Sequence, residues 1–266
     1  MEHIETMNRI EELFSKKKQN ILSVFFTAGF PSLNDTGTIA LSLQQAGVDL
    51  IEIGIPFSDP IADGPVIQQS SKQAIDNGMT LKLLLEQVRE LRKQVYIPII
   101  LMGYLNPVMQ YGMNKLFVDA AKAGVDGLIL PDMPFDEYES IYRQSMEQAG
   151  LRNIFLISPT TSEARIRKID QATDAFIYAV SSSSTTGARE GFQTDQVQYF
   201  ERLKRMNLKN QFLIGFGISN AETFSTACTY GAGAIVGSAF INMLKQSNDI
   251  PADIQNFVSL LKSKAS

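Results

Sequence analysis

The sequence contains very few of the residues from which metal sites and hydrolase triads are built. Histidine occurs once, at His3, and cysteine occurs once, at Cys228, far away along the chain. A zinc centre needs several His or Cys ligands, and a serine hydrolase needs a histidine base. The sequence therefore excludes a His/Cys zinc cluster and a Ser/His triad. We expect no bound metal, and acid–base chemistry falls to carboxylates or tyrosines.

Long apolar runs are missing as well. The most apolar stretch, residues 97–102, contains a proline and falls far short of the roughly 18 apolar residues that a membrane helix needs, so it suits a buried strand. The N-terminal residues are charged where a secretory signal would be apolar, and a lone cysteine cannot form an internal disulfide. We therefore expect a protein of the reducing cytoplasm with no membrane role.

Positive charge is not in excess. The formal net charge is −4, the isoelectric point is near 5.2, and no Lys/Arg cluster is interleaved with aromatics, which argues against a nucleic-acid partner. A (β/α)₈ barrel occupies about 250 residues, so a chain of 266 residues has room for one. We expect a single domain over residues 1–266, in which local groups hold any small anionic ligand.

Short apolar runs, typical of strands, alternate along the chain with longer stretches of helical periodicity. The helical stretches include residues 35–45, 81–94, 114–122 and 195–205. This alternation indicates βα units around a parallel sheet. It predicts an α/β fold, a (β/α)₈ TIM barrel, with strands at residues 22–27, 50–55, 97–102, 127–130, 154–157, 175–180, 212–215 and 234–237.

The ends of several helices are marked by capping residues and glycines. Asn34-Asp35 offers a cap before the helix at 35–45, and Gly47 and Gly124 follow helix ends within a repeated Ala-Gly-Val-Asp. We interpret this repeat as structural, at the stability face of the barrel. Residues 4–15 predict an extra N-terminal helix that plugs the bottom of the barrel, with one apolar face made of Ile4, Met7, Ile10, Leu13 and Phe14.

The end of the second strand carries the most chemistry. Glu52 has apolar neighbours on both sides, so its side chain is expected to point into the barrel, where desolvation raises the pKa of a carboxyl group toward a proton-transfer role. The alternative is a buried glutamate that only packs. The loop that follows carries two more carboxylates, Asp59 and Asp63, which are candidates for the same site. For Asp63 the alternative is a structural role, as an acceptor for loop N–H groups.

Glycine-rich turns after the last two strands predict a phosphate site. Barrels hold phosphate on backbone N–H groups of these loops, and glycines allow the close approach, although barrel turns use glycine in any case. The expected phosphate-binding residues are Gly215, Phe216, Gly217, Gly237 and Ser238. The small, polar segment 181–191 has the length of an active-site lid, with a plain flexible linker as the alternative.

The stretch from Glu52 to Pro65, EIGIPFSDPIADGP, resembles the signature of tryptophan synthase alpha subunits. Further matches follow in the order of that family over essentially the whole chain, at residues 101–107, 124–134, 185–189, 215–219 and 237–238. The resemblance implies a lyase of tryptophan biosynthesis that cleaves indole-3-glycerol phosphate into indole and glyceraldehyde 3-phosphate by a retro-aldol reaction.

The same resemblance assigns roles to individual residues. Glu52 is expected to perform both proton transfers, and Asp63 to accept a hydrogen bond from the indole N–H. Asp59 is expected to communicate with the partner subunit. The expected substrate-binding residues are Phe25, Tyr104, Ile129, Tyr178 and Thr186, and Gly187 completes the phosphate set.

Thr186 matches the lid threonine of the family. The lid departs from the family pattern at Ser182 and Ser184, where Arg and Gly are usual. Each wall residue, and Tyr178, is alternatively a packing residue. The expected partner is the tryptophan synthase beta subunit in an α₂β₂ heterotetramer. Pyridoxal phosphate belongs to that subunit, and no cofactor is expected in this chain.

Three other functions stay open from the residues alone. A different phosphate-binding barrel, either an indole-3-glycerol phosphate synthase or a metal-dependent epimerase, needs a lysine or histidine ligands that the eight predicted strands lack. A regulatory binding module would be free to lose Glu52 and Asp63, which are both present. A free-standing lyase would share the chemistry and need no beta subunit.

Overall fold

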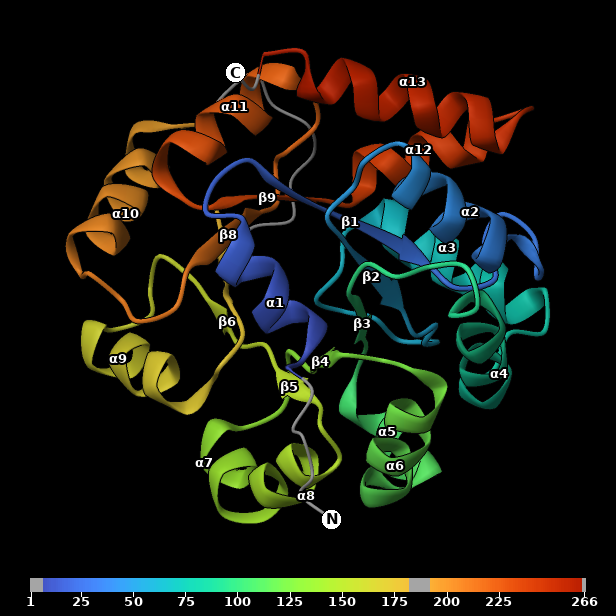
Figure 1. The fold of residues 1–266 in the computed structure, drawn as a ribbon, viewed down its shortest axis with the longest axis horizontal. Coiled ribbons are helices and arrows are strands. Elements are labelled where there is room, and N and C mark those ends of the chain that lie inside the picture. Colours follow the sequence, from blue (N-terminus) through green and yellow to red (C-terminus); the bar gives the residue numbers. More distant parts are fainter. Residues whose placement is uncertain (1–6, 182–191, 265–266) are drawn as a thin grey trace.

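The structure, a computed structural model, describes residues 7–181 and 192–264, and its strands form one parallel sheet that curls into a barrel (Figure 1). The strand order is β5-β4-β3-β2-β1-β9-β8-β7-β6. The strands are β1 Ile21–Thr27, β2 Leu50–Gly54, β3 Ile99–Met102, β4 Gly127–Ile129, β5 Arg152–Asn153, β6 Leu156–Ile157, β7 Ile177–Val180, β8 Phe212–Gly215 and β9 Gly233–Val236.

The ring closes through the segment that sequence analysis predicts as one strand at residues 154–157. β5 pairs with β4, whereas β6 pairs with β7, and only Ile154 and Phe155 separate them. The N–H of Ile154 donates to the carbonyl of Leu128, and the carbonyl of Phe155 accepts from Tyr178 N–H. The single predicted strand at 154–157 is therefore wrong: two short strands lie within residues 152–157, because this segment changes its pairing partner at its middle.

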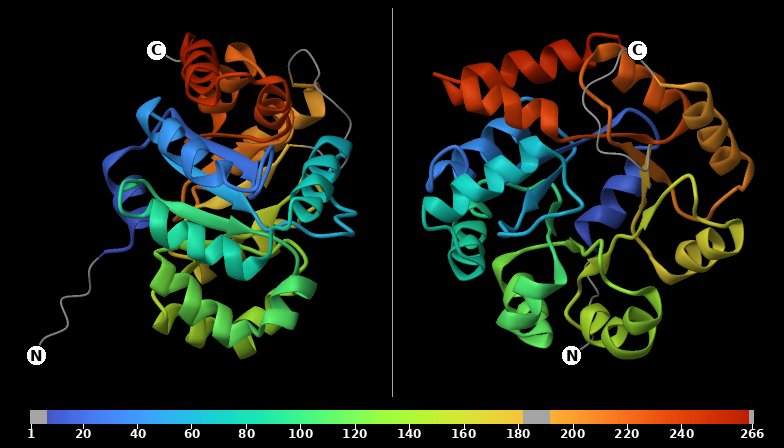
Figure 2. Two further views of the ribbon diagram at one scale, coloured as in Figure 1. Left: turned by 90° about the vertical axis from the view of Figure 1, so that its right-hand side faces the viewer. Right: turned by 180° about the vertical axis from the view of Figure 1, so that it is seen from behind.

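Apart from α1, the helices surround the barrel on the outside, as two further views show (Figure 2). None of the described helices is long and apolar enough to cross a membrane. The helices are α1 Arg9–Lys16, α2 Asp35–Gln45, α3 Pro65–Asp76, α4 Leu81–Leu91, α5 Leu105–Tyr111, α6 Met113–Ala123, α7 Phe135–Glu137, the π-helix η1 Tyr138–Tyr142, α8 Arg143–Gln148, α9 Glu163–Ala172, α10 Thr194–Arg205, α11 Ala221–Tyr230, α12 Ser238–Gln246 and α13 Ile250–Lys262.

Helix α1 closes the N-terminal end of the barrel, which confirms the predicted plug (Figure 1). Ile10 and Phe14 are buried against inward-pointing strand residues, and the ring of Phe14 stacks on that of Phe176 with centroids 5.2 Å apart. The predicted extent of the helix is wrong at its start. Asn8 is the N-cap and its side chain accepts from the N–H of Ile10, so Met7 precedes the helix and is 60% exposed; Ile4 lies outside the described residues.

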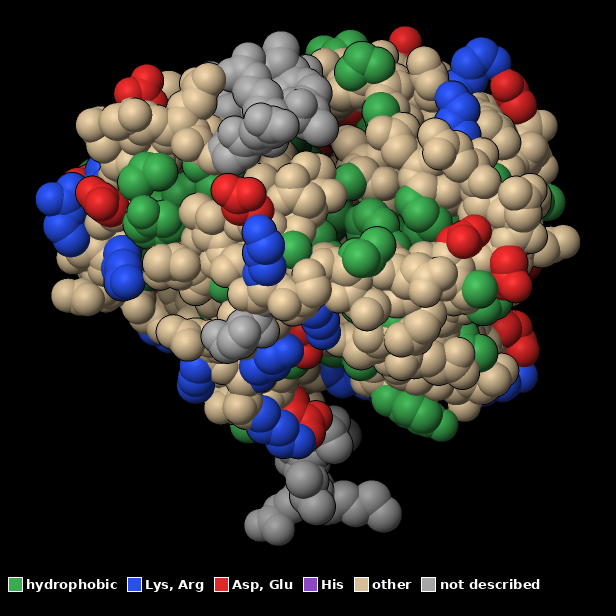
Figure 3. All heavy atoms as spheres, turned by 90° about the horizontal axis from the view of Figure 1, so that it is seen from above, with side chains coloured by type: hydrophobic (Ala, Val, Ile, Leu, Met, Phe, Trp, Pro, Cys, Tyr) green, Lys and Arg blue, Asp and Glu red, His purple; other side chains and the backbone are tan. Residues whose placement is uncertain are grey.

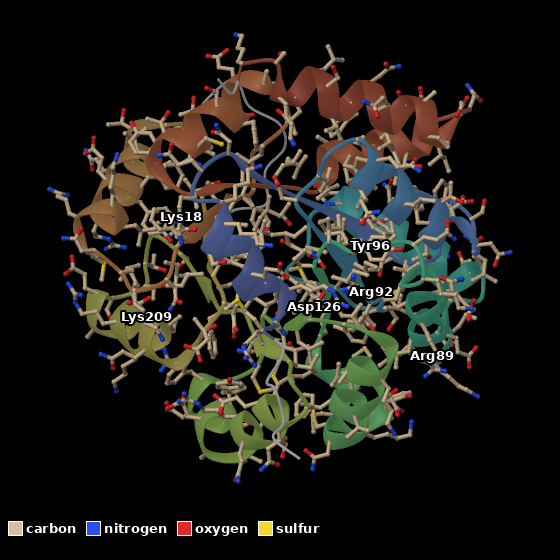
Figure 4. All side chains as sticks on the ribbon, in the orientation of Figure 1. Lys18, Arg89, Arg92, Tyr96, Asp126 and Lys209 are labelled. Atoms are coloured by element: carbon tan, nitrogen blue, oxygen red, sulfur yellow. The ribbon has the colours of Figure 1, made fainter. Side chains whose placement is uncertain are left out.

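The aspartates of the repeated Ala-Gly-Val-Asp bind strand N–H groups at the N-terminal face of the barrel. Asp49 accepts a hydrogen bond from Leu22 N–H at 2.8 Å, and Asp126 accepts one from Ile99 N–H at 2.8 Å. Each aspartate therefore accepts from an N–H group at the start of the neighbouring strand, that of the second residue of β1 and that of the first residue of β3. Arg92 of α4 also pairs with Asp126, and both are labelled in Figure 4. The structural interpretation of this repeat is confirmed.

Two local predictions at element ends are wrong. Asn34 precedes α2, but its side chain makes no capping hydrogen bond; the carboxylate of Asp35 instead accepts from the N–H of Ser32. β3 begins at Ile99 and not at residue 97, because Pro98 has no N–H to donate to a ladder. On the outer face seen in Figure 3, acidic and basic side chains are interspersed, with apolar side chains between them.

Candidate active site

A cavity of about 340 Å³ opens at the C-terminal ends of the strands. Its walls are mostly apolar, and a few polar groups, among them Asp63 and Tyr104, converge on it from the loops. Ligand sites in proteins typically have this size and composition. The lining residues are Phe25, Thr27, Gly54, Ile55, Phe57, Pro60, Ala62, Asp63, Ile67, Ser71, Met102, Gly103, Tyr104, Pro131, Leu156, Ile157, Ser158, Thr161, Val180 and Phe216.

Glu52 lies one layer below this cavity, inside the barrel. It is paired in register with Phe25 and precedes Gly54 by two residues, so it shares their inward direction, and both line the cavity. Its side chain is fully buried. Its Oε1 accepts a hydrogen bond from the Ser23 hydroxyl at 2.6 Å, while Oε2 has no hydrogen-bond partner among the described residues.

Burial sets the protonation behaviour of this carboxyl group. Removal from water raises the pKa of Glu52 to about 7, and the Ser23 hydrogen bond acts in the opposite direction because it favours the charged form. A carboxyl group with a pKa near neutrality exists in both protonation states at the pH of a cell. It is therefore suited to give and to take a proton.

Two glycines at inward positions make room for the aromatic rings around Glu52. A Cβ atom on Gly54 would lie 2.7 Å from the ring of Phe25, and one on Gly215 would lie 2.4 Å from the hydroxyl of Tyr178. Each ring therefore occupies the space that a side chain on the neighbouring strand would fill. Because glycine has no side chain, each ring packs closely against the neighbouring strand, and this packing fixes both rings beside the carboxylate.

Tyr178 is 5% exposed and points inward from β7. Burial raises the pKa of its hydroxyl far above the ordinary value, and the negative charges of Glu52 and Asp63 raise it further. The hydroxyl therefore stays protonated, as a donor and not as a base. The ring meets that of Phe216 edge to face, with centroids 6.3 Å apart, so Tyr178 also supports the cavity wall.

Asp63 lies on the loop between β2 and α3. Its Oδ2 accepts a hydrogen bond from the Tyr104 hydroxyl at 3.0 Å, and that hydroxyl in turn accepts from Ala62 N–H at 3.2 Å. Burial raises the pKa of Asp63 and the hydrogen bond from Tyr104 opposes that rise. The rings of Phe57 and Tyr104 pack 5.3 Å apart. Tyr104 thus connects the loop between β2 and α3 to the end of β3, through these hydrogen bonds and the ring contact.

The glycine-rich turns after β8 and β9 lie at the same end of the barrel. Phe216 has a left-handed backbone, with φ of +68°, and its carbonyl accepts from the Ser181 hydroxyl at 2.7 Å. Gly237 is the N-cap of α12 and Ser238 is its first residue, with no side-chain cap at that end. The first N–H groups of a helix lack intrahelical partners and carry the positive end of its dipole, so this turn favours an anion.

The chain as a whole matches known proteins. The family model "Tryptophan synthase alpha chain" matches residues 12–265. The alpha chain of Parabacteroides distasonis is 53% identical over 247 residues, which cover 93% of this chain and 96% of that one. The alpha chain of Flavobacterium psychrophilum is 52% identical over 253 residues, covering 95% and 99%. The chain belongs to the tryptophan synthase alpha chain family.

Solved structures agree with this family membership. The tryptophan synthase alpha chain of Legionella pneumophila superposes with a TM-score of 0.87 at 33% identity, covering 97% of each chain. A tryptophan synthase from M. tuberculosis in an aminoacrylate-bound form gives a TM-score of 0.85 at 25% identity, covering 98% of this chain. The TIM-barrel prediction is confirmed, and so is the resemblance on which the family prediction depends.

The structure brings most of the predicted site residues of this alpha chain together. Phe25, Asp63, Tyr104 and Phe216 line the cavity directly. Glu52 and Tyr178 lie beneath it, and Gly215, Gly217, Gly237 and Ser238 lie at the same end of the barrel, in the turns after β8 and β9. Among the described residues no group of three or more His, Cys, Asp or Glu side chains is arranged to hold a metal ion.

Two of the other predicted residues, Ile129 and Asp59, are also absent from the cavity lining. Ile129 is fully buried in the barrel interior, and its register partner Met102 lines the cavity in its place. Asp59 is exposed on the loop after β2, where its carboxylate accepts from the Ser58 hydroxyl at 2.6 Å. The lid residues Thr186 and Gly187, together with Ser182 and Ser184, lie outside the described residues.

Sequence analysis missed two kinds of residue in the alpha-chain site. Ser23 contacts Glu52 directly, and Phe57 packs on Tyr104. The signal for Ser23 is present in the sequence, because a serine occupies an inward position in the middle of a first strand that is otherwise apolar up to Thr27. The signal for Phe57 is absent, because a loop has no periodicity from which the direction of a side chain follows.

Proposed function

We propose that Glu52 and Asp63 carry the chemistry of this chain, the retro-aldol cleavage of indole-3-glycerol phosphate into indole and D-glyceraldehyde 3-phosphate. The observation that supports the assignment best is the state of Glu52. It is a fully buried carboxyl group with a pKa near 7, directly below an apolar cavity, and one of its oxygens has no hydrogen-bond partner among the described residues. Desolvation of this kind is how a carboxylic acid is kept available for proton transfer near neutral pH.

The carboxyl group of Glu52 acts twice. In its neutral form it protonates C3 of the indole, which produces an indolenine cation. The resulting carboxylate then takes the proton of the glycerol hydroxyl next to C3. As the C–O bond becomes a carbonyl, the C–C bond breaks and its electron pair returns to the ring. Indole and the aldehyde leave, and Glu52 is again protonated, so a pKa near 7 serves both steps.

Asp63 stabilises the cation that forms in the first step. Protonation at C3 places positive charge on the indole nitrogen, and a carboxylate that accepts the N–H hydrogen bond lowers the energy of that intermediate. The hydrogen bond from Tyr104 fixes Oδ2 and leaves Oδ1 for the substrate. Apolar side chains of the cavity, including Phe25, Met102 and Leu156, are suited to hold the flat ring between them.

We assign the substrate phosphate to the turns after β8 and β9, that is to Gly215–Gly217, Gly237 and Ser238, with Gly187 as a further contact. Backbone N–H groups and the dipole of α12 supply the positive potential that a dianion needs. Tyr178 is assigned to hold the carboxylate or the side chain of the substrate, and Thr186 to close the site.

The chain is assigned a beta-subunit partner, because M. tuberculosis tryptophan synthase is among its structural neighbours. We infer an α₂β₂ heterotetramer in which pyridoxal phosphate is bound by the beta subunit and no cofactor by this chain. We propose that the loop after β2 contacts the beta subunit, since Asp59 is exposed there and Ile61 is 88% exposed.

The test is indole release from indole-3-glycerol phosphate by the purified chain, with and without a beta subunit. Wild type is compared with Glu52→Gln, which keeps the shape and removes the proton transfer, and with Glu86→Gln, an exposed glutamate on α4. We expect activity that the beta subunit increases, that Glu86→Gln retains and that Glu52→Gln abolishes. Full activity in Glu52→Gln would contradict the assignment.

A further inference from the structure

We propose that Ser23 is a positioning residue for this reaction, because its hydroxyl holds one carboxylate oxygen of Glu52 and so reserves the other oxygen for proton transfer. The proposal rests on the catalytic role proposed for Glu52. Ser23 lies on β1 at an inward position, between Ile21 and Phe25, and its register partner on β2 is Leu50. Its hydroxyl therefore reaches Glu52 from one layer below.

The contact is isolated from water. The side chains of Ser23 and Glu52 are both fully buried, and the distance from Ser23 Oγ to Oε1 is 2.6 Å, within the range of a charge-assisted hydroxyl–carboxylate hydrogen bond. A buried hydroxyl without a partner is unfavourable, so Ser23 keeps this bond. The hydroxyl donates, and Oε1 is thereby occupied as an acceptor.

The two oxygens of Glu52 consequently differ. Oε2 has no hydrogen-bond partner among the described residues, so the proton of the neutral acid resides on Oε2 and leaves from there. Rotation of the carboxyl group would exchange the oxygens, but it would break the bond from Ser23. The serine thus determines which oxygen delivers the proton and in which direction, which is the kind of alignment that speeds proton transfer.

The neighbours of Glu52 make this hydrogen bond important for its charge. Tyr178 on β7 lies near enough for the charges of Glu52 and of Asp63, on the β2 loop, to act on its hydroxyl, and neither residue supplies a positive charge to the carboxylate. From β3, β8 and β9 the inward residues are apolar: Ile100, Leu213 and Ile235. Among the described residues, Ser23 is the group that hydrogen-bonds the carboxyl of Glu52, and this bond favours the carboxylate form against the effect of burial.

This predicts a shift in the pH profile when the hydroxyl is removed. The reaction starts from neutral Glu52, so the rate falls as pH rises through the pKa of that group. Without Ser23 the carboxylate loses its hydrogen bond, the pKa rises, and the alkaline limb of kcat moves up by about one pH unit. Because the proton is no longer aligned, kcat below the limb falls roughly tenfold, with KM within about twofold of wild type.

The experiment measures kcat and KM for indole-3-glycerol phosphate from about pH 6 to about pH 9.5, with the full chain in complex with its beta subunit. The variants are Ser23→Ala, Ser23→Thr, which restores a hydroxyl, and Glu52→Gln. Thr173→Val is the matched control, since it removes a buried hydroxyl that donates to the carbonyl of Asn153 at the opposite end of the barrel. We expect Thr173→Val to keep the wild-type limb and Ser23→Thr to regain it.

A second measurement does not depend on activity. The ¹³C signal of the Glu52 carboxyl carbon, identified by its loss in Glu52→Gln, is titrated in wild type and in Ser23→Ala, and we expect a higher midpoint in the variant. An unchanged limb together with an unchanged midpoint would overturn the role of Ser23 while leaving Glu52 catalytic. If Glu52→Gln stays active, the proposed function fails instead. A fall in kcat without any shift would also overturn the proposal, because it would reduce Ser23 to a packing residue.

Discussion

Replacing Glu52 with glutamine is expected to stabilise the fold, and the gain in stability is expected to grow as the pH rises. The carboxyl group has a pKa of about 7 in the folded chain, against an ordinary value of 4.5. Because the folded pKa is the higher one, the folded state prefers the protonated form. The stability linked to that proton is fully present below about pH 4.5 and is lost as the pH rises through 7.

The size of the effect follows from the difference between the two pKa values. A separation from 4.5 to about 7 costs about 3 kcal/mol once the carboxyl group is ionised in the folded state. Glu52 is fully buried, so solvent does not screen this cost. Glu52→Gln carries no charge and avoids it. We therefore expect the variant to exceed wild type by about 3 kcal/mol near pH 8, and by about 1 kcal/mol or less near pH 5.

The assay is urea unfolding of wild type and Glu52→Gln at both pH values, with Glu86→Gln as the exposed control. The control is expected to show no pH-dependent gain. If Glu52→Gln gained equally at both pH values, the stabilisation would come from packing and not from ionisation. If it gained nothing near pH 8, the carboxyl group would not be desolvated as the structure has it, and its proposed role as a proton donor would lose its basis.

Two further changes test the surroundings of the carboxylates. Tyr104→Phe removes the hydroxyl that bonds Asp63, so kcat/KM for indole-3-glycerol phosphate is expected to fall roughly tenfold while the melting temperature changes little; an unchanged kcat/KM would show that the tyrosine does not position Asp63. Gly215→Ala places a Cβ against the ring of Tyr178, so we expect a loss of about 1–3 kcal/mol of stability in urea unfolding. Gly37→Ala on α2, where a Cβ meets nothing within 4 Å, is instead expected to raise stability, and equal effects of the two would refute the packing argument.

The local signals of the sequence predicted most of the elements. The β-rich runs and the helical periodicity give the barrel and place Glu52 on an inward strand position, because side-chain direction in a strand follows from a period of two. The predictions failed at helix starts, where neighbouring polar side chains are alternative hydrogen-bond partners for the same stretch of backbone. The side chain of Asn34 does not cap α2, and the carboxylate of Asp35 accepts a hydrogen bond from the N–H of Ser32 instead. The first helix begins at Arg9 because the side chain of Asn8 caps it.

The sequence by itself determined the kind of fold, the family and the placement of Glu52 and Asp63 at the end of the second strand, since each of these follows from a local pattern or a contiguous motif. Only the tertiary structure decided that the fifth predicted strand divides between two neighbours, that Met102 and not Ile129 lines the cavity, and that Ser23 holds Glu52. The physical reason is distance along the chain. Hydrogen bonds and packing between separate strands form only when the barrel closes, and no single segment contains both partners.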